Sequence, residues 1–266
     1  MTLNYSFQFD DYPTIFEDPN VDNINDIAKI RLSERPVRKI SIILDRIFFK
    51  ENVVFYRIEN IFLYLLTIVL TSLFTLKITK DRKFALLSIF LFSLHPVHME
   101  NILIISHRKE LFMYIFSMLS FMFHIDRKRA LSLVFFFIAI LSKEVAVILP
   151  LLFYLYDRIF KREIDKKLYY IYGGIFAAGI ISVTLLSKFT GFYIPSPSNL
   201  DEYFKVNRML RGAGYMDIIK IQPILFAKYI KNLLLPFNLN VDYYIPVTDK
   251  VGLLWILSFA VSSGYF

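Results

Sequence analysis

Long apolar runs separated by short clusters of charged residues make up most of this sequence from residue 53 onward. A bilayer core of about 30 Å needs roughly 20 apolar residues per helix, and several of the runs approach that length. The pattern predicts an all-α fold, a polytopic membrane helical bundle of about seven to eight hydrophobic segments with extracytoplasmic loops. The expected segments are residues 53–76, 84–106, 110–125, 130–142, 145–160, 168–187, 221–236 and 251–266.

Four regions follow from this pattern. Residues 1–50 are polar and are expected to form an extracytoplasmic loop with paired acids and an amphipathic helix on the membrane surface. Residues 51–187 hold the core transmembrane helices. Residues 188–220 contain Pro and Gly and are predicted to be a second extracytoplasmic loop, and residues 221–266 hold further transmembrane segments. The apolar positions that predict the surface helix are Ile40, Ile43, Leu44 and Ile47.

The composition agrees with a membrane protein and excludes other classes. Hydrophobic residues make up 56% of the 266 residues, and the mean hydropathy is +0.50, too apolar for an ordinary cytosolic domain. The chain has no Cys, which excludes disulfides, thiolate metal sites and Cys nucleophiles. Because there are only 8 Gly, a Gly-rich phosphate loop is not expected, and any phosphate must be bound by side chains.

The net charge of +8 indicates orientation in a membrane rather than binding to nucleic acid, for which the sequence has no motif. When the loops are assigned to alternating sides, one set holds three Lys and Arg residues (Arg108, Lys109 and Lys143) and the other holds twelve. The twelve are Lys77, Lys80, Arg82, Lys83, Arg127, Lys128, Arg129, Arg158, Lys161, Arg162, Lys166 and Lys167. The positive-inside rule places the larger set in the cytoplasm. The extracytoplasmic side then holds residues 1–50, 94–110, 142–144 and about 188–220.

Asp10 and Asp11 are the first candidates for chemistry. Two adjacent carboxylates beside aromatic residues at a membrane boundary repel each other and lose solvent. Both effects raise the pKa of one carboxyl and suit it to act as a general base. The alternative is an Asx turn ahead of Pro13, a common structural use of such a dipeptide.

Three of the four histidines lie between residues 95 and 107, where one predicted span ends and the next begins. Ionisable groups at membrane depth often line a site or pathway. His95, His98, Glu100 and Glu110 are therefore candidates for orienting a substrate. A divalent cation is the cofactor that this set could take, with Asp11, His98 and Glu100 as candidate ligands. The alternative is that these side chains only make hydrogen bonds, because Pro96 would interrupt a helix here.

Arg35, Arg38, Lys39, Arg108, Lys109 and Lys143 lie on the predicted extracytoplasmic side and form a cationic set that could bind phosphate. Arg can hold a phosphate in a fork geometry, and Lys can act as a point charge. The alternative for each of them is a charge that extends from the membrane interface to lipid headgroups. Two weaker candidate sites follow. The Lys143-Glu144 pair at a span boundary is ordinarily structural, and Asp242-Tyr243 fits a turn after a helix.

Five stretches, in this order, resemble the membrane-embedded C-type glycosyltransferases, and most closely the O-mannosyltransferase-like branch whose members often carry C-terminal tetratricopeptide repeats. The stretches are FQFDDYPTIFEDPNV, RPVRKIS, LFSLHPVHMENILIISHRKELF, AILSKEVAVILPLLFYLYD and FAKYIKNLLLPFNLNVDYY. They cover about residues 7–245. HPVH with the following Glu, RKE and SKE are fairly specific as a set, whereas the paired acids alone are not.

The resemblance implies transfer of a mannose-like sugar from a polyprenyl-phosphate donor to a hydroxyl acceptor, expected to be protein Ser or Thr, with inversion on the extracytoplasmic or lumenal face. By the same resemblance, Asp10, favoured over Asp11, would be the general base, a role typically worth about 10²–10⁴ in rate. Arg35, Arg108 and Lys109 would hold the leaving phosphate. The residues implied to orient substrate or close the site are His95, His98, Glu100, Glu110, Lys143, Glu144, Asp242 and Tyr243.

Two departures from the family pattern matter. No span precedes the paired acids, and the chain stops within an apolar run at Phe266, so it is expected to be truncated at both ends. The alternatives are the same chemistry on a lipid or glycan acceptor, and a non-catalytic transporter or membrane fragment. Low Gly, the lack of a repeat and the clustering of charges at one face disfavour a transporter.

The expected partners are membrane lipid, the lipid-linked sugar and a protein or glycan acceptor, with no nucleic acid. The short loops and the lack of a eukaryotic targeting signal favour a bacterial or archaeal plasma membrane over the endoplasmic reticulum. The sequence therefore predicts a multi-pass integral membrane enzyme, with all of its candidate chemistry on one side of the bilayer.

Overall fold

The computed structural model describes residues 6–7, 11–30, 34–175, 177, 215–237 and 239. The chain divides into two compact units, Met1–Gly179 and Ile180–Phe266. The secondary structure of the described residues is helical and includes no strand, which confirms the all-α prediction. The predicted features that lie outside the described residues are Asp10, residues 178–187 of the segment 168–187, most of the loop at 188–220, Asp242, Tyr243 and the segment 251–266.

Seven α-helices of the first unit lie wholly within the described residues, with short turns of 3-10 or π-helix between some of them. Its elements are η1 (Tyr12–Phe16), η2 (Ile24–Lys29), α1 (Pro36–Phe49), α2 (Val53–Thr79), α3 (Arg82–Leu94), η4 (Pro96–His98), α4 (Met99–Leu103), η5 (Ile105–His107), α5 (Arg108–Ile125), α6 (Arg129–Ser142), η6 (Glu144–Ile148) and α7 (Leu149–Ile159). Residues 166–175 are also helical. The described part of the second unit contains α10 (Tyr215–Leu234).

Helix α2 is the described helix that by itself is long and apolar enough to cross a membrane. It spans 27 residues, and the Asn52 side chain caps its first turn by accepting a hydrogen bond from the backbone N–H of Val54. Only 22% of its most apolar window is buried. Most of its apolar side chains are therefore not buried inside the protein, unlike those of a core helix in a soluble protein.

The predicted segment 84–106 is not one straight helix. Helix α3 ends at Leu94, and residues Pro96–Leu103 continue at an angle of 54°. His95 has an extended backbone, as residues before proline usually do, and Pro96 has no N–H to continue the helical ladder. If this bent pair is one span, the described residues contain two candidate spans.

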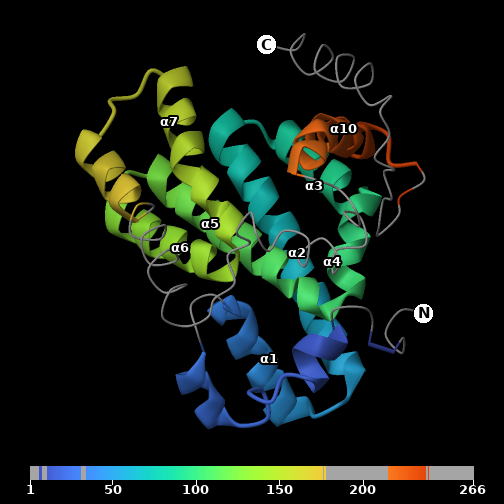
Figure 1. Ribbon diagram of the computed structural model, residues 1–266. Helices are drawn as coiled ribbons and strands as arrows, with labels where there is room; N and C mark the ends of the chain where they lie inside the picture. Colours follow the sequence, from blue (N-terminus) through green and yellow to red (C-terminus); the bar gives the residue numbers. More distant parts are fainter. Residues whose placement is uncertain are drawn as a thin grey trace. The chain divides into compact units, whose positions relative to one another are not determined.

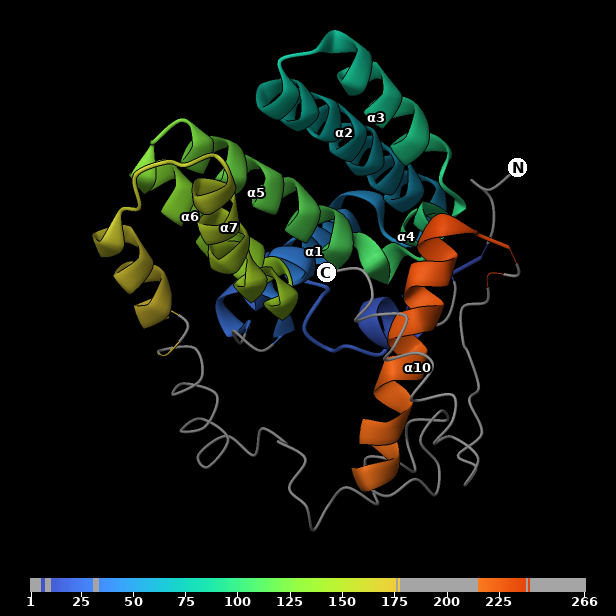
Figure 2. The ribbon, with the colours of Figure 1, turned by 90° about the horizontal axis from the view of Figure 1, so that it is seen from above.

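Two antiparallel helix pairs form the body of the first unit. Helix α2 packs beside α3, α5 packs beside α6, and α2 also contacts α5 (Figures 1 and 2). Between α2 and α5 the core contains Leu63, Tyr64, Leu70, Leu111 and Ile115. A second core between α5, α6, η6, α7 and the helix at 166–175 contains Phe121, Phe136, Ala139, Ala146, Leu149, Phe153, Leu168 and Tyr172.

The antiparallel order gives this unit two different ends. We call the end with α1, residues 94–110 and residues 142–148 the loop end, and the end with residues 77–83, 125–129 and 157–167 the basic end (Figure 1). Ion pairs and hydrogen bonds tie the basic end together: Lys77 pairs with Asp126 at 2.6 Å, and Arg162 donates to the carbonyl of Ile125 at 2.8 Å. Among the described residues of this unit, the loops of the two sets assigned from the sequence therefore lie at opposite ends.

Helix α1 forms where an amphipathic helix was predicted and packs on η2, α5 and α6 at the loop end. The face of α1 that was predicted to be apolar is not the face that is buried. Ile43 is buried, but Leu44 and Ile47 are exposed, and the polar residues Lys39 and Asp45 are buried instead. Lys39 and Asp45 point inward because residues of opposite charge lie there: Asp18 and Glu34 beside Lys39, and Arg108 beside Asp45.

Candidate functional site

Arg108 lies at the centre of a buried polar network at the loop end. It is the first residue of α5, and none of its surface is exposed. Its Nε donates to Asn60 Oδ1 at 2.8 Å, and its Nη2 donates to the carbonyl of Tyr56 at 3.1 Å. Its Nη1 donates to Ser41 Oγ at 2.9 Å and to Asp45 Oδ2 at 2.6 Å. One guanidinium therefore fastens α1 and α2 to the start of α5.

A second carboxylate completes this network. Glu59 Oε2 lies 3.0 Å from Nη1 of Arg108, so two acids share one buried cation. Burial of an unpaired charge is costly, and this arrangement satisfies the guanidinium within the protein. Arg108, which was predicted to bind phosphate, therefore has its nitrogens covered and paired with groups of the protein.

Asp11 is also buried and has a structural partner. Its Oδ1 accepts a hydrogen bond of 2.7 Å from the backbone N–H of Ser106, which joins the N-terminal region to η5. Arg57, buried on α2, interacts with Asp11 electrostatically and donates to the carbonyl of Ser6 at 2.9 Å. With no exposed surface, Asp11 is placed to hold the loop rather than to meet an acceptor. Asp10, the favoured base, lies outside the described residues.

Arg35 and Glu144 form a two-pronged ion pair between distant parts of the sequence. Arg35 Nη2 donates to Glu144 Oε1 at 2.8 Å and Nε donates to Oε2 at 3.2 Å. Arg35 precedes α1 in a left-handed backbone conformation, with φ of 55°, and Pro36 follows at the first turn. The hydrogen bonds from Arg35 outweigh partial burial and hold the pKa of Glu144 below its usual range.

The neighbouring residue Lys143 makes a second ion pair at the same place. Its Nζ donates to Glu110 Oε1, and both side chains are mostly covered. Lys109, another predicted phosphate ligand, is buried and has partners within the protein. Arg35, Glu110, Lys143 and Glu144 form what we call the charged cluster.

Lys39 lies on α1, one helical turn after Arg35, and has ion pairs of its own outside the charged cluster. Its Nζ lies 2.8 Å from Asp18 Oδ2 and 2.9 Å from Glu34 Oε2. Burial alone would lower the pKa of Lys39, but hydrogen bonds to these two carboxylates reverse the effect and raise the pKa. Asp18 and Glu34 were not predicted as site residues, because their shared partner Lys39 is evident only from the packing of α1.

The histidine segment packs against aromatic rings. The His98 ring lies 4.2 Å from the ring of Phe92 and 5.8 Å from that of Tyr64, and the His95 ring lies 5.9 Å from His98. Glu100 Oε1 lies 3.3 Å from Nδ1 of His107, a partner that we did not predict. In the part of the chain that the structure describes, no three His, Cys, Asp or Glu residues form a group that could hold a metal ion.

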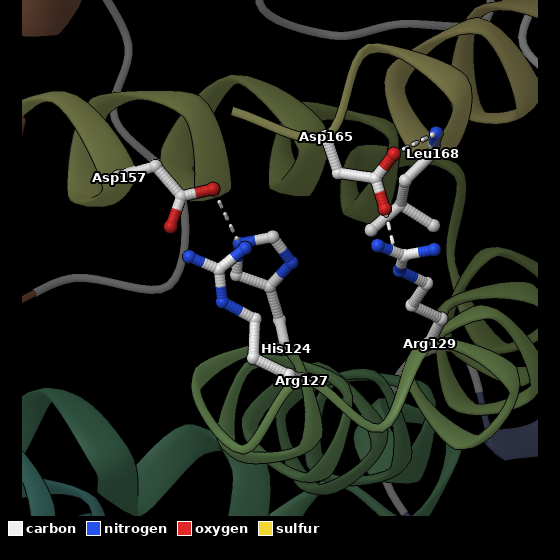
Figure 3. A pocket seen from close by; sticks show the side chains of 6 residues that line it. All are labelled: His124, Arg127, Arg129, Asp157, Asp165 and Leu168. Atoms are coloured by element: carbon white, nitrogen blue, oxygen red, sulfur yellow. Dashed lines mark hydrogen bonds and ion pairs between the residues drawn. The ribbon is translucent and has the colours of Figure 1, made fainter. Parts of the chain in front are cut away.

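A further ionisable cluster lies at the basic end (Figure 3). His124 Nε2 lies 3.0 Å from Asp157 Oδ2, and the hydroxyl of Tyr169 donates to the same oxygen at 3.0 Å. A cavity of about 10 Å³ adjoins them, room for about one water molecule and too small for a substrate. The sequence analysis missed this pair, although two ionisable residues within predicted apolar segments are a recognisable signal.

The charged cluster combines two cations and two carboxylates from three separate stretches of chain at one end of the bundle. An anion can bind such a set by displacing one of the carboxylates, because Arg donates hydrogen bonds to a phosphate in the same fork geometry as to a carboxylate. No protein-family model, curated protein or solved structure matches the chain, so its function has to be inferred from its own residues.

Proposed function

We propose that the chain is an integral membrane glycosyltransferase that moves a mannose-like sugar from a polyprenyl-phosphate donor to a hydroxyl acceptor on the extracytoplasmic or lumenal face. In this reaction the acceptor oxygen attacks the anomeric carbon, the bond from that carbon to the phosphate oxygen breaks, and the acceptor proton passes to a carboxylate. Polyprenyl phosphate departs with one more negative charge than it had as a diester. The configuration at the anomeric carbon inverts.

The observation that carries the proposal is the charged cluster. Arg35 comes from the first loop, Glu110 from α5, and Lys143 and Glu144 from the turn after α6, yet they form two adjacent ion pairs. Electrostatic stabilisation of a departing phosphate requires cations held in place before the reaction. Arg35 and Lys143 meet this requirement, and their carboxylate partners keep them positioned until an anion arrives.

The exposed surface of α2 and α3 supports the membrane location. Phe62 and Leu65 on α2 are 64% and 54% exposed, and Phe90 and Leu91 on α3 are 61% and 59% exposed. Soluble monomers rarely expose apolar patches of more than a few hundred Å², whereas lipid-facing helices expose them along their length. The proposal of a multi-pass membrane protein rests on this surface together with the further apolar segments in the sequence.

The proposed roles differ from those expected from the sequence for four residues: Asp11, Arg108, Lys143 and the buried Lys109, which no longer has a proposed phosphate contact. Asp10 remains the proposed general base, and the buried Asp11 becomes a positioning residue that anchors the chain beside it through Ser106. Arg108 likewise becomes a positioning residue, because it holds α1, which begins next to Arg35. The proposed contacts to the leaving phosphate are then Arg35 and Lys143.

The proposal is tested by incubating the full chain in lipid with a panel of polyprenyl-phosphate sugars and measuring release of polyprenyl phosphate. Asp10→Asn should lower release by about 10²–10⁴-fold, the usual contribution of a general base. Asp22→Asn makes the same chemical change at an exposed acid in the same region and should leave release unchanged. Release that is equal in all three proteins would reject Asp10 as the base.

The acceptor is identified in the same experiment. A mass increase on a protein or peptide would support Ser or Thr as the acceptor, and sugar recovered in the lipid or glycan fraction would support the alternative chemistry. Flux of the sugar into vesicles without release of polyprenyl phosphate would reject glycosyl transfer in favour of transport.

A further inference from the structure

A groove of about 360 Å³ opens between α2 and α5 at the basic end, far along the chain from the charged cluster. Its lining is both apolar and cationic. The residues that line it are Leu73, Leu76, Lys77 and Lys80 from α2 and Met122 from α5.

The order of these residues along α2 is informative. Leu73, Leu76 and Lys80 are separated by three and four positions, so they share one face of the helix, and Lys77 lies beside Leu76 on that face. The face is therefore apolar toward the middle of α2 and cationic where the helix ends. A molecule that matches it has an apolar chain directed into the membrane and an anionic group at the interface.

The two lysines are held differently. Lys77 is fixed at the rim of the groove by its ion pair of 2.6 Å with Asp126. Lys80 is exposed and occupies the left-handed position that ends α2, with φ of 59°. Asp81 follows Lys80 and caps α3, and Arg82 and Lys83 begin that helix, so four basic residues outweigh the two acids Asp81 and Asp126 around this rim.

We propose that this groove binds an anionic phospholipid of the leaflet at the basic end, with its phosphate at Lys77 and Lys80 and an acyl chain against Leu73, Leu76 and Met122. Lys binds phosphate as a point charge, and basic residues at the end of a span attract anionic headgroups. Met is unbranched and adapts to an irregular chain. The occupant is a lipid rather than a protein segment because the groove continues the exposed apolar face of α2, on which Leu65 and Val69 precede Leu73.

This inference does not depend on the proposed enzymatic function, and its test uses no sugar donor. The full chain would be placed in nanodiscs of phosphatidylcholine with increasing phosphatidylglycerol, and the lipid that remains bound after transfer to detergent would be counted by mass spectrometry. Wild-type chain should retain phosphatidylglycerol in preference to phosphatidylcholine. Lys77→Gln/Lys80→Gln should weaken that retention by about 30-fold, the effect expected from removing two interfacial charges.

A matched control distinguishes lipid binding in the groove from general attraction of anionic lipid to a positively charged surface. Lys166→Gln/Lys167→Gln removes the same charge from the same end but outside the groove, and it should retain phosphatidylglycerol as the wild type does. Lys80→Gln alone, at an exposed position, provides a variant with an intact Lys77–Asp126 pair and should show a smaller loss.

Three results would overturn the proposal. The first is a wild-type chain that retains both lipids equally, and the second is a control that loses as much retention as the groove variant. The third is displacement of phosphatidylglycerol by polyprenyl phosphate at a much lower concentration, which would assign the groove to the lipid carrier instead.

Discussion

Arg35 and Glu144 are 109 positions apart in the sequence, yet both oxygens of the carboxylate accept hydrogen bonds from one guanidinium, at 2.8 and 3.2 Å. This pair joins the N-terminal region to the turn between α6 and α7. The carboxylate occupies the fork that a phosphate would use, so Glu144 competes with an incoming anion for Arg35. Removal of the Glu144 charge should therefore affect anion binding and stability in opposite directions.

The first prediction concerns the stability of this ion pair. Glu144→Gln should lower the free energy of unfolding by no more than about 1 kcal/mol, because the Glu144 side chain is 67% exposed and solvent screens the pair. The pKa of Glu144 lies below its usual value of 4.5, so the contribution is present above about pH 4.5 and is lost as the pH falls through the folded-state pKa.

Thermal unfolding in detergent over a range of pH measures both effects. The difference between wild type and Glu144→Gln should be constant at neutral pH and vanish in acid. A difference that grows in acid would contradict the assigned pKa direction. In the same samples, affinity for polyprenyl phosphate should rise in Glu144→Gln and fall in Arg35→Gln.

The second prediction concerns Arg108. Arg108→Met should lower the free energy of unfolding by about 3–5 kcal/mol, because it leaves the buried Asp45 carboxylate without its cation and also removes the ion pair with Glu59. The Arg108→Met, Asp45→Asn double variant should recover part of the loss. Chemical unfolding of the three proteins in detergent checks this. Near wild-type stability of Arg108→Met would show instead that the guanidinium is free to serve a ligand.

The third prediction separates the two adjacent acids. Asp11→Asn should lower the free energy of unfolding by about 1–3 kcal/mol, since it weakens a buried hydrogen bond of 2.7 Å to the Ser106 N–H. Asp10→Asn should leave unfolding unchanged while it lowers transfer by about 10²–10⁴-fold. Parallel stability and release measurements on both variants test this division. Two variants with the same profile would argue against it.

Much of the helical framework was predictable from local pattern. The predicted segments 53–76, 110–125 and 130–142 correspond to Val53–Thr79, Arg108–Ile125 and Arg129–Ser142, because long apolar runs bounded by charges form helices. The predicted segment 145–160 differs at its start, where residues Glu144–Ile148 form a 3-10 helix and the α-helix begins at Leu149. Pro150 lies in the first turn of α7, the position that proline favours.

The candidate site was only partly predictable, because residue type does not specify a partner. The sequence placed Arg108 among the phosphate ligands, but its carboxylate partner Asp45 lies 63 positions away on a helix whose polar side turns inward. Arg35 carried the same signal and has a partly exposed side chain. The two arginines differ in how far they are buried, and burial depends on tertiary packing, which the sequence pattern does not show.

The fourth prediction concerns the basic end. Asp157→Ala should lower the free energy of unfolding by about 3–5 kcal/mol, because Asp157 is buried against His124 and receives a hydrogen bond from Tyr169. Tyr169→Phe removes one hydrogen bond and should cost about 1 kcal/mol. Unfolding in detergent measures both. If Asp157 served the proposed reaction, sugar transfer per folded molecule would fall, and we expect it to stay unchanged.

The fifth prediction tests whether the apolar face of α2 contacts lipid. Leu65 lies near the middle of α2 and is 54% exposed, and Ile24 in η2 is 53% exposed, so the two positions are matched in exposure. Leu65→Lys should cost about 2.5–3.5 kcal/mol in membrane insertion, the value for Lys at the centre of a span. Ile24→Lys should change stability by no more than about 0.5 kcal/mol, as at an ordinary solvated surface.

The fraction of each protein that remains in the membrane after an alkaline wash measures this difference. If α2 were exposed to water, Leu65→Lys would be as harmless as Ile24→Lys, because a lysine on a solvated helix face meets no unfavourable environment. A large loss in Leu65→Lys alone requires a surrounding medium without water. That outcome would place α2 in the bilayer, and since α2 and α3 share one exposed apolar surface, it would place their lipid-facing sides there together.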